Sequence, residues 1–94
     1  MKASRSAGNE RRAFGEVLTA TRKRCGMSQE TLAFESGLHR TYISQLERGL
    51  KAPTLETLFD LARALEVTPT DLISQTELLL ATGNPPSRSR CPNS

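Results

Sequence analysis

The chain has 94 residues, of which 36% are hydrophobic and none is tryptophan, so it is long enough for one small domain with an aliphatic core. No apolar run approaches the roughly 20 residues of a membrane span, and the start lacks the apolar middle of a secretion signal, so we expect a cytoplasmic protein. The two cysteines show neither CxxC nor Cys/His metal spacing, which disfavours a zinc site and favours Cys25 as a small, partly buried apolar residue.

The formal net charge of +3 is distributed unevenly along the chain. The two ends, residues 1–12 and 81–94, carry six basic residues and one acidic residue. Residues 22–51 carry six basic against three acidic residues, whereas residues 52–80 carry one basic against five acidic residues. A basic region of this kind attracts phosphate, although an ordinary mixed-charge surface explains the counts equally well.

The sequence predicts an all-α domain over residues 13–80, preceded by a disordered basic arm at 1–12 and followed by a flexible Pro/Ser-rich tail at 81–94. The first helix is expected over residues 13–24, because its apolar residues keep the spacing of one buried helical stripe. Gly26 follows it, as a glycine commonly does just beyond a helix.

Two short helices are predicted next, joined by a tight turn at Gly37. Ser28 is a suitable N-cap for a helix over residues 29–36. A further helix follows over residues 40–48 and ends at Gly49. Apolar residues on both helices would face a common core, and polar residues occupy the other side of the second helix. This is the helix-turn-helix arrangement.

The last two of the five predicted helices also begin with recognisable caps. Thr54 caps a helix whose leucines form a buried stripe. Thr68 caps the final helix, in which Pro69 takes the first position because its missing N–H costs nothing there. This helix reaches at least Ser74, and an extension through Leu80 is left open.

The segments SQETLAFESGLHRTYISQLERG and PTLETLFDLARALEVTPTDLI together resemble the DNA-binding domain of the Cro and phage-repressor family, also called the xenobiotic-response-element type. The resemblance covers residues 14–73. It implies a compact five-helix, repressor-like fold and a transcriptional regulator that binds a dyad-symmetric, double-stranded DNA operator as a homodimer. No cofactor, metal or small-molecule ligand is implied.

The resemblance implies that residues at the start and on the outer face of the second short helix read base edges: Arg40, Thr41, Ser44 and Gln45. The chemistry of these side chains agrees with that role. Arg40 can donate two hydrogen bonds to guanine, Gln45 can pair with adenine, and the Thr41 methyl can contact a thymine methyl. For Thr41 and Ser44, an exposed polar residue without a partner is an equal alternative.

Phosphate contacts are expected from Gln29, His39, Tyr42, Arg48 and Lys51. His39 stands where many family members carry a small hydroxyl residue, and it caps a helix less well than serine or threonine. A solvated turn residue is the alternative for His39. Tyr42 is expected to pack at the core edge with its hydroxyl towards a phosphate.

The resemblance also implies an ion pair between Arg22 and Glu47. The family usually dimerises through surfaces around its last two helices, where this chain offers Phe59, Leu78, Leu79 and Leu80 as candidate contacts. Alternatively, Phe59 completes the core and the leucines finish the last helix against its own domain.

Catalysis finds little support, because no Ser or Cys nucleophile has a convincing base partner and phosphate-cradling glycine motifs are missing. We therefore expect a regulator that is not an enzyme, and restriction–modification controllers are one subtype of this size. An antitoxin that represses its own operon is one alternative. A protein-interaction module of the same fold is another, against which the basic residues from Arg22 to Lys51 argue.

Overall fold

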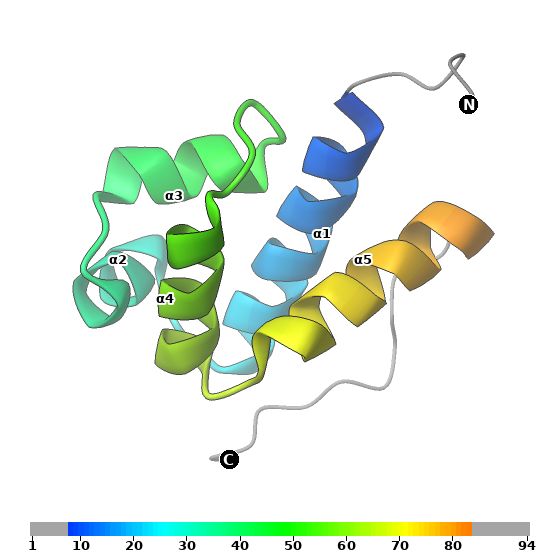
Figure 1. Ribbon diagram of the computed structural model, residues 1–94. Coiled ribbons are helices and arrows are strands. Elements are labelled where there is room, and N and C mark those ends of the chain that lie inside the picture. The colour runs from blue at the N-terminus through cyan, green and yellow to red at the C-terminus, as the bar shows by residue number, and fades with distance from the viewer. Residues whose placement is uncertain (1–7, 84–94) are drawn as a thin grey trace.

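Five helices occupy residues 8–83, the part of the chain that the computed structural model describes (Figure 1). They are α1 (Gly8–Arg24), α2 (Gln29–Ser36), α3 (Arg40–Glu47), α4 (Leu55–Leu65) and α5 (Pro69–Thr82). The predicted all-α class is confirmed, and these residues contain no strand. Within the same range, no helix combines the length and the apolar character that crossing a membrane requires.

Helix α1 begins at Gly8, well before the predicted start at Ala13. The prediction that residues 8–12 belong to a disordered arm is therefore wrong. No apolar stripe in residues 8–12 predicts a helix. However, Arg11 and Arg12 contact the loop that follows α3, and these tertiary contacts favour the N-terminal extension of α1. The rest of the predicted arm, residues 1–7, lies outside the described residues.

Helix α5 extends to Thr82 and ends at Gly83, which has a left-handed φ of +76°. The longer of the two predicted versions is thus observed. The predicted tail is wrong for residues 81–82, which continue the helix, and its remainder, residues 84–94, lies outside the described residues.

Three predicted N-caps form as expected. Ser28 accepts a hydrogen bond from the Thr31 N–H at 3.0 Å, and Thr54 accepts one from the Thr57 N–H at 3.0 Å. Thr68 does the same for the Asp71 N–H at 2.9 Å. Each hydroxyl satisfies a first-turn donor that has no partner within its own helix, so each cap is encoded within four consecutive residues.

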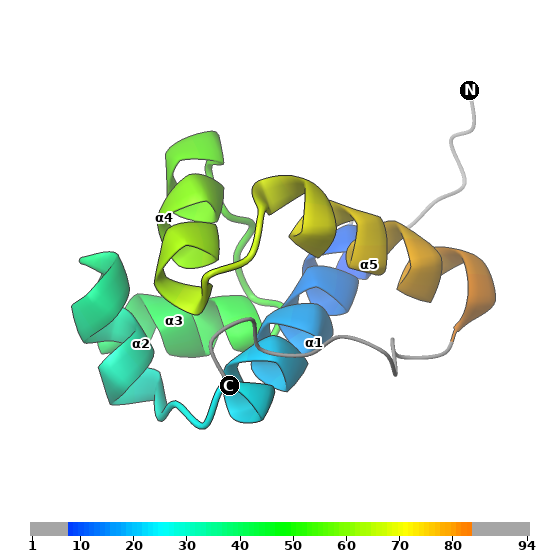
Figure 2. The same ribbon diagram turned by 90° about the horizontal axis from the view of Figure 1, so that it is seen from below.

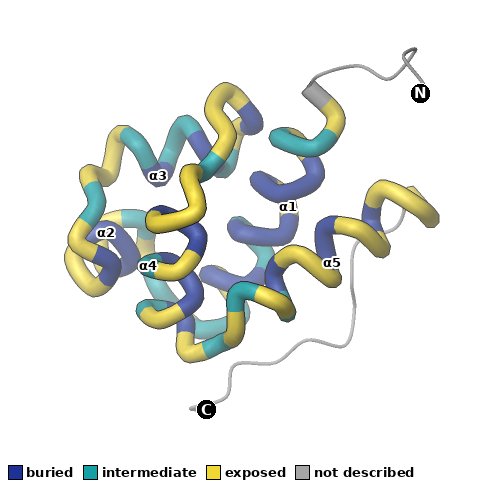
Figure 3. The backbone as a smooth tube through the Cα atoms, in the orientation of Figure 1, coloured by how far each residue is buried: buried dark blue, intermediate teal, exposed yellow. Residues whose placement is uncertain are grey.

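The core lies between the five helices, with α1 packed against α3 on one side and α5 on the other (Figures 1 and 2). Figure 3 shows the buried residues on the facing sides of the helices and the exposed residues outside. The fully buried side chains come from every helix: Val17, Leu18, Leu32, Ile43, Leu46, Leu61, Leu65 and Leu72. Burial of each such side chain stabilises the fold by about 1.5–3 kcal/mol.

Gly15 allows α1 to approach the end of α3 closely. A Cβ atom at this position would lie 2.6 Å from the backbone oxygens of both Leu46 and Glu47. Backbone oxygens cannot swing aside as the tip of a long side chain can. A larger residue at position 15 would therefore displace α3 relative to α1.

We expect Gly15→Ala to lower the thermal unfolding midpoint. Overpacking costs typically about 1–3 kcal/mol, which outweighs the gain of about 1 kcal/mol in helix propensity when backbone atoms obstruct the new methyl group. Glu16→Ala, at the adjacent exposed position, is the control and should unfold close to the wild-type temperature. A Gly15→Ala protein more stable than wild type would contradict the close-packing argument.

Candidate DNA-binding surface

Helix α3 separates its apolar and polar residues onto different sides. Ile43 and Leu46 are fully buried and hold the helix against α1 and α2. Arg40 and Thr41 are exposed, whereas Ser44 and Gln45 are half-buried. With about 3.6 residues per turn, these four polar positions adjoin one another away from the buried pair. The helix therefore presents a row of hydrogen-bonding side chains at the surface.

The turn between α2 and α3 has the geometry that the sequence predicts. Gly37 has a left-handed φ of +77°, which favours glycine, and the Leu38 N–H donates to the Ala33 carbonyl at 3.0 Å. His39 occupies the N-cap of α3, is exposed, and makes no side-chain capping hydrogen bond. Its imidazole is thus not committed to the helix end, and its contact with phosphate stays a prediction.

A buried ion pair joins α1 to the last residue of α3. Arg22 Nε donates to Glu47 Oε2 at 2.6 Å, and Arg22 Nη2 donates to Glu47 Oε1 at 3.0 Å. The two side chains are only 10% and 5% exposed. This parallel, two-bond geometry fixes the relative direction of the guanidinium and the carboxylate, and with them the two helices.

The same cluster includes the start of α2, which the sequence did not indicate. Gln29 Nε2 donates to Glu47 Oε1 at 2.9 Å, and Arg22 Nη1 donates to the Met27 carbonyl at 2.8 Å. Glu47 thus holds the first residue of α2 as well as α1. One amide hydrogen of Gln29 is used by Glu47, which leaves the other for the predicted phosphate contact.

Burial alone would raise the pKa of the Glu47 carboxyl, but its partners reverse the effect. Hydrogen bonds from Arg22 and Gln29, the charge of Arg22 and the nearby Thr19 hydroxyl together hold its pKa below the ordinary value of 4.5. A carboxyl whose pKa is lowered by folding stabilises the fold above its unfolded-state pKa. That contribution is lost as the pH falls through the lowered folded-state pKa.

We expect Glu47→Ala to lower the free energy of unfolding by about 3–5 kcal/mol at pH 7 without DNA, because it leaves the buried Arg22 charge without its partner. Asp60→Ala is the matched control, since the exposed Asp60–Arg63 pair is worth about 0–1 kcal/mol. Denaturant unfolding measures both. Equal stability of the two variants would reduce the Arg22–Glu47 pair to a surface contact.

The same pair predicts a pH dependence. The stability difference between wild type and Glu47→Gln should be full at neutral pH and should shrink as the pH falls below the ordinary carboxyl pKa and through the lowered one. Unfolding curves across this acidic range measure the difference. A gap that stays constant would show that Glu47 ionisation does not contribute to stability.

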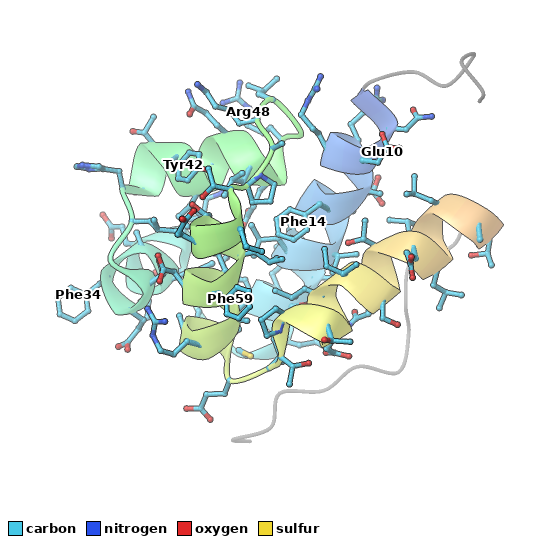
Figure 4. All side chains as sticks on the ribbon, in the orientation of Figure 1. Glu10, Phe14, Phe34, Tyr42, Arg48 and Phe59 are labelled. Atoms are coloured by element: carbon cyan, nitrogen blue, oxygen red, sulfur yellow. The ribbon has the colours of Figure 1, made fainter. Side chains whose placement is uncertain are left out.

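Exposed cations follow directly after α3. Arg48 and Lys51 flank Gly49, whose φ is +75°, and the Leu50 N–H donates to the Gln45 carbonyl at 2.9 Å to close the helix end. Figure 4 shows Arg48 at the outer edge of the molecule. Neither cation pairs with another described residue, and the contact of each with a phosphate stays a prediction.

Two aromatic residues near this surface behave differently. Tyr42 is half-buried and packs against the core, as expected, while its hydroxyl contact with phosphate stays a prediction. Phe34 is 84% exposed and projects from α2 away from the core (Figure 4). Its position two residues after the buried Leu32 is the signal that would have identified it as exposed.

The three consecutive leucines of α5 point in different directions. Leu79 is only 8% exposed and belongs to the core of its own chain, so its prediction as a dimer contact is wrong. Leu78 and Leu80 are about half exposed, and Leu80 borders a groove. Helical periodicity separates adjacent residues by roughly 100°, so a run of three cannot share one face.

Two apolar grooves adjoin on the side formed by α4 and α5. One, of about 340 Å³, lies between α4 and α5 beside Leu55 and Phe59. The other, of about 250 Å³, lies between α1, the loop before α4 and α5, and is bordered by Leu80. Ile73 borders both grooves. We call Leu55, Phe59, Ile73 and Leu80 the apolar α4–α5 surface; Phe59 is 53% exposed on it and does not complete the core.

Comparisons with known proteins point to one family. A family model described as helix-turn-helix matches residues 18–72. The control protein C.BamHI of Bacillus amyloliquefaciens is 44% identical over 71 residues, which are 74% of this chain and 88% of that protein.

Solved structures agree with this match. The restriction-modification controller protein C.AhdI from Aeromonas hydrophila has a TM-score of 0.65 and 44% identity, covering 66% of this chain and 94% of that one. The controller C.Esp1396I, solved as a tetramer in complex with its natural 35 base-pair operator, has a TM-score of 0.72 and 29% identity, covering 83% of this chain and 100% of that one.

Proposed function

Since the chain belongs to the Cro and phage-repressor type of the helix-turn-helix family, we propose that it is a sequence-specific transcriptional regulator of the restriction–modification controller type. One observation carries the proposal: α3 holds a row of polar side chains outward, beside exposed cations. Such a protein binds the chromosome in the cytoplasm, and its role is recognition rather than catalysis.

Base reading is assigned to the outer face of α3. Arg40 donates two hydrogen bonds to guanine O6 and N7, and Gln45 donates to and accepts from adenine. Thr41 contacts a thymine methyl, and the Ser44 hydroxyl bonds a neighbouring base. Because Ile43 and Leu46 anchor the opposite side, the row moves with the domain as a rigid unit.

Phosphate contacts position this row on the duplex. Gln29 at the start of α2, His39 and Tyr42 at the start of α3, and Arg48 and Lys51 after it are assigned to the DNA backbone. These contacts carry no sequence information themselves, but they set the register in which α3 meets the bases. They also make binding dependent on salt, because each neutralised phosphate releases counterions.

A homodimer is expected to read two half-sites related by a two-fold axis. The apolar α4–α5 surface supplies an exposed apolar area suited to a second copy, with Glu77 at its border and Leu78 as a further exposed leucine on α5. A single domain reads too few base pairs to define one genomic site, whereas two copies read half-sites about one helical turn, ~34 Å, apart.

Direct binding tests the proposal. Fluorescence anisotropy with a duplex from the region upstream of the protein's own gene should give an affinity at least about 10³-fold above that for a scrambled duplex. The same affinity for both duplexes would contradict sequence-specific regulation at this site.

We expect Arg40→Ala or Gln45→Ala to cost about 1–3 kcal/mol on the specific duplex and to relax the preference at one base position. Arg63→Ala, which removes an exposed arginine from the last turn of α4, is the control and should bind as wild type. Anisotropy with single-base operator variants measures the preference. Equal weakening on specific and scrambled DNA would show that neither residue reads bases.

Dimerisation through the apolar α4–α5 surface gives another prediction. Phe59→Asp should convert the dimer to a monomer in sedimentation velocity, because it places a charge in the interface. Phe34→Asp, which replaces a still more exposed phenylalanine on α2, is the control and should stay dimeric. A wild-type monomer at concentrations that saturate the operator would contradict the paired half-site mechanism.

A further inference from the structure

We propose that Arg12 is an additional phosphate-binding residue, so that the N-terminal turns of α1 extend the DNA-backbone surface beyond α3 and its following loop. The inference rests on the proposed function. It concerns a part of the helix outside the segment matched by the family model, residues 18–72.

The side chain of Arg12 lies directly on Gly49. A Cβ atom at Gly49 would be 2.7 Å from Arg12 Cγ and 3.0 Å from Arg12 Cα, so the aliphatic stem of Arg12 occupies the space that a side chain would need. Gly49 is accordingly buried. Arg11 Nε also donates to the Gly49 carbonyl at 3.5 Å. Two consecutive residues of α1 therefore hold the loop that follows α3.

The aliphatic stem of Arg12 packs on Gly49, but Arg12 as a whole is exposed. This is expected for an arginine whose stem covers other residues while its guanidinium stays in water. Gly49 directly follows Arg48 and precedes Lys51 by two residues. The contact with Gly49 thus brings Arg12 beside a loop that carries two other exposed cations, and we call these three residues the basic edge.

The acidic groups around the basic edge do not neutralise it. Glu47, at the end of α3, is taken by Arg22 and Gln29. Glu10 borders the apolar groove on the α5 side. Glu16 lies four residues after Arg12, within reach of it along α1, but the two form no ion pair. Among the described residues, Arg12, Arg48 and Lys51 form no ion pair. Their mutual repulsion in the free protein is relieved when phosphates lie between them.

The basic edge is placed to meet DNA together with α3. Figure 1 shows the first turns of α1 beside the loop after α3, along the edge on which α3 lies. Arg48 marks this edge in Figure 4. When the polar side of α3 faces a groove, the Arg12 guanidinium reaches the backbone that flanks the contacts of Arg48 and Lys51.

The salt dependence of binding tests the assignment. Affinities of wild type, Arg12→Gln, Arg12→Ala and Arg12→Lys would be measured with labelled upstream and scrambled duplexes between about 50 and 200 mM salt. Loss of one phosphate contact lowers the log–log slope by about 0.9 per subunit, hence about 1.8 per dimer. We expect this loss for Arg12→Gln and Arg12→Ala on both duplexes, whereas Arg12→Lys keeps the wild-type slope.

The variants separate phosphate binding from packing. Arg12→Gln retains part of the stem over Gly49, so a wild-type slope for this variant would overturn the assignment. Arg63→Ala removes the same charge from α4, and a loss as large as that of Arg12→Gln would also overturn it by revealing a general charge effect. Failure of wild type to prefer the upstream duplex would contradict the proposed function instead, and the slopes on scrambled DNA would still decide the role of Arg12.

Discussion

The orientation of α3 depends on a single buried carboxylate, that of Glu47. An ionised group removed from water is tolerated only when its oxygens are fully partnered. Here Oε2 accepts from Arg22, and Oε1 accepts from both Arg22 and Gln29. Because these donors come from α1 and α2, the requirement to satisfy one charge fixes three helices relative to one another. An apolar contact would hold the three helices together but would fix the angles between them less narrowly than these hydrogen bonds do. The reason is that dispersion and apolar burial are not directional.

Helix α1 carries a second stripe of residues, distinct from its apolar stripe, which contacts the end of α3 and the loop after it. Arg12, Gly15, Thr19 and Arg22 follow one another at spacings of three and four residues and therefore share one face. Every member contacts the end of α3 or its following loop. Arg12 covers Gly49, Gly15 allows the two backbones to approach closely, Thr19 lies beside Glu47, and Arg22 donates hydrogen bonds to Glu47. Because these residues form no hydrophobic pattern, the sequence alone does not identify the stripe. It is recognised only from the packing of α3 against α1.

The features that the sequence could predict are those encoded by neighbouring residues. The caps at Ser28, Thr54 and Thr68 and the turn at Gly37 need only local chemistry, and all are present. The Arg22–Glu47 contact spans 25 positions and was suggested by the family resemblance rather than by spacing.

The features that the sequence did not reveal, or that were predicted wrongly from it, depend on tertiary contacts. The early start of α1 is favoured by contacts with Gly49, and the role of Gln29 in the Glu47 cluster depends on a residue 18 positions away. Leu79 was misassigned because an apolar run does not tell which of its members faces the core.

The arrangement of α1 between α3 and α5 bears on how a dimer would read two half-sites. The apolar α4–α5 surface reaches α1 at the groove bordered by Phe14, and α1 in turn is locked to α3 through Gly15 and Glu47. Packed helices connect the proposed dimer contact to the proposed reading helix, so in the proposed dimer packing would set the distance between the two reading helices. A dimer preorganised in this way loses little conformational freedom when its second half binds. In the proposed dimer, rigidity of the small core contributes to operator selectivity, because a half-site spacing that the packing does not match would require the core itself to deform.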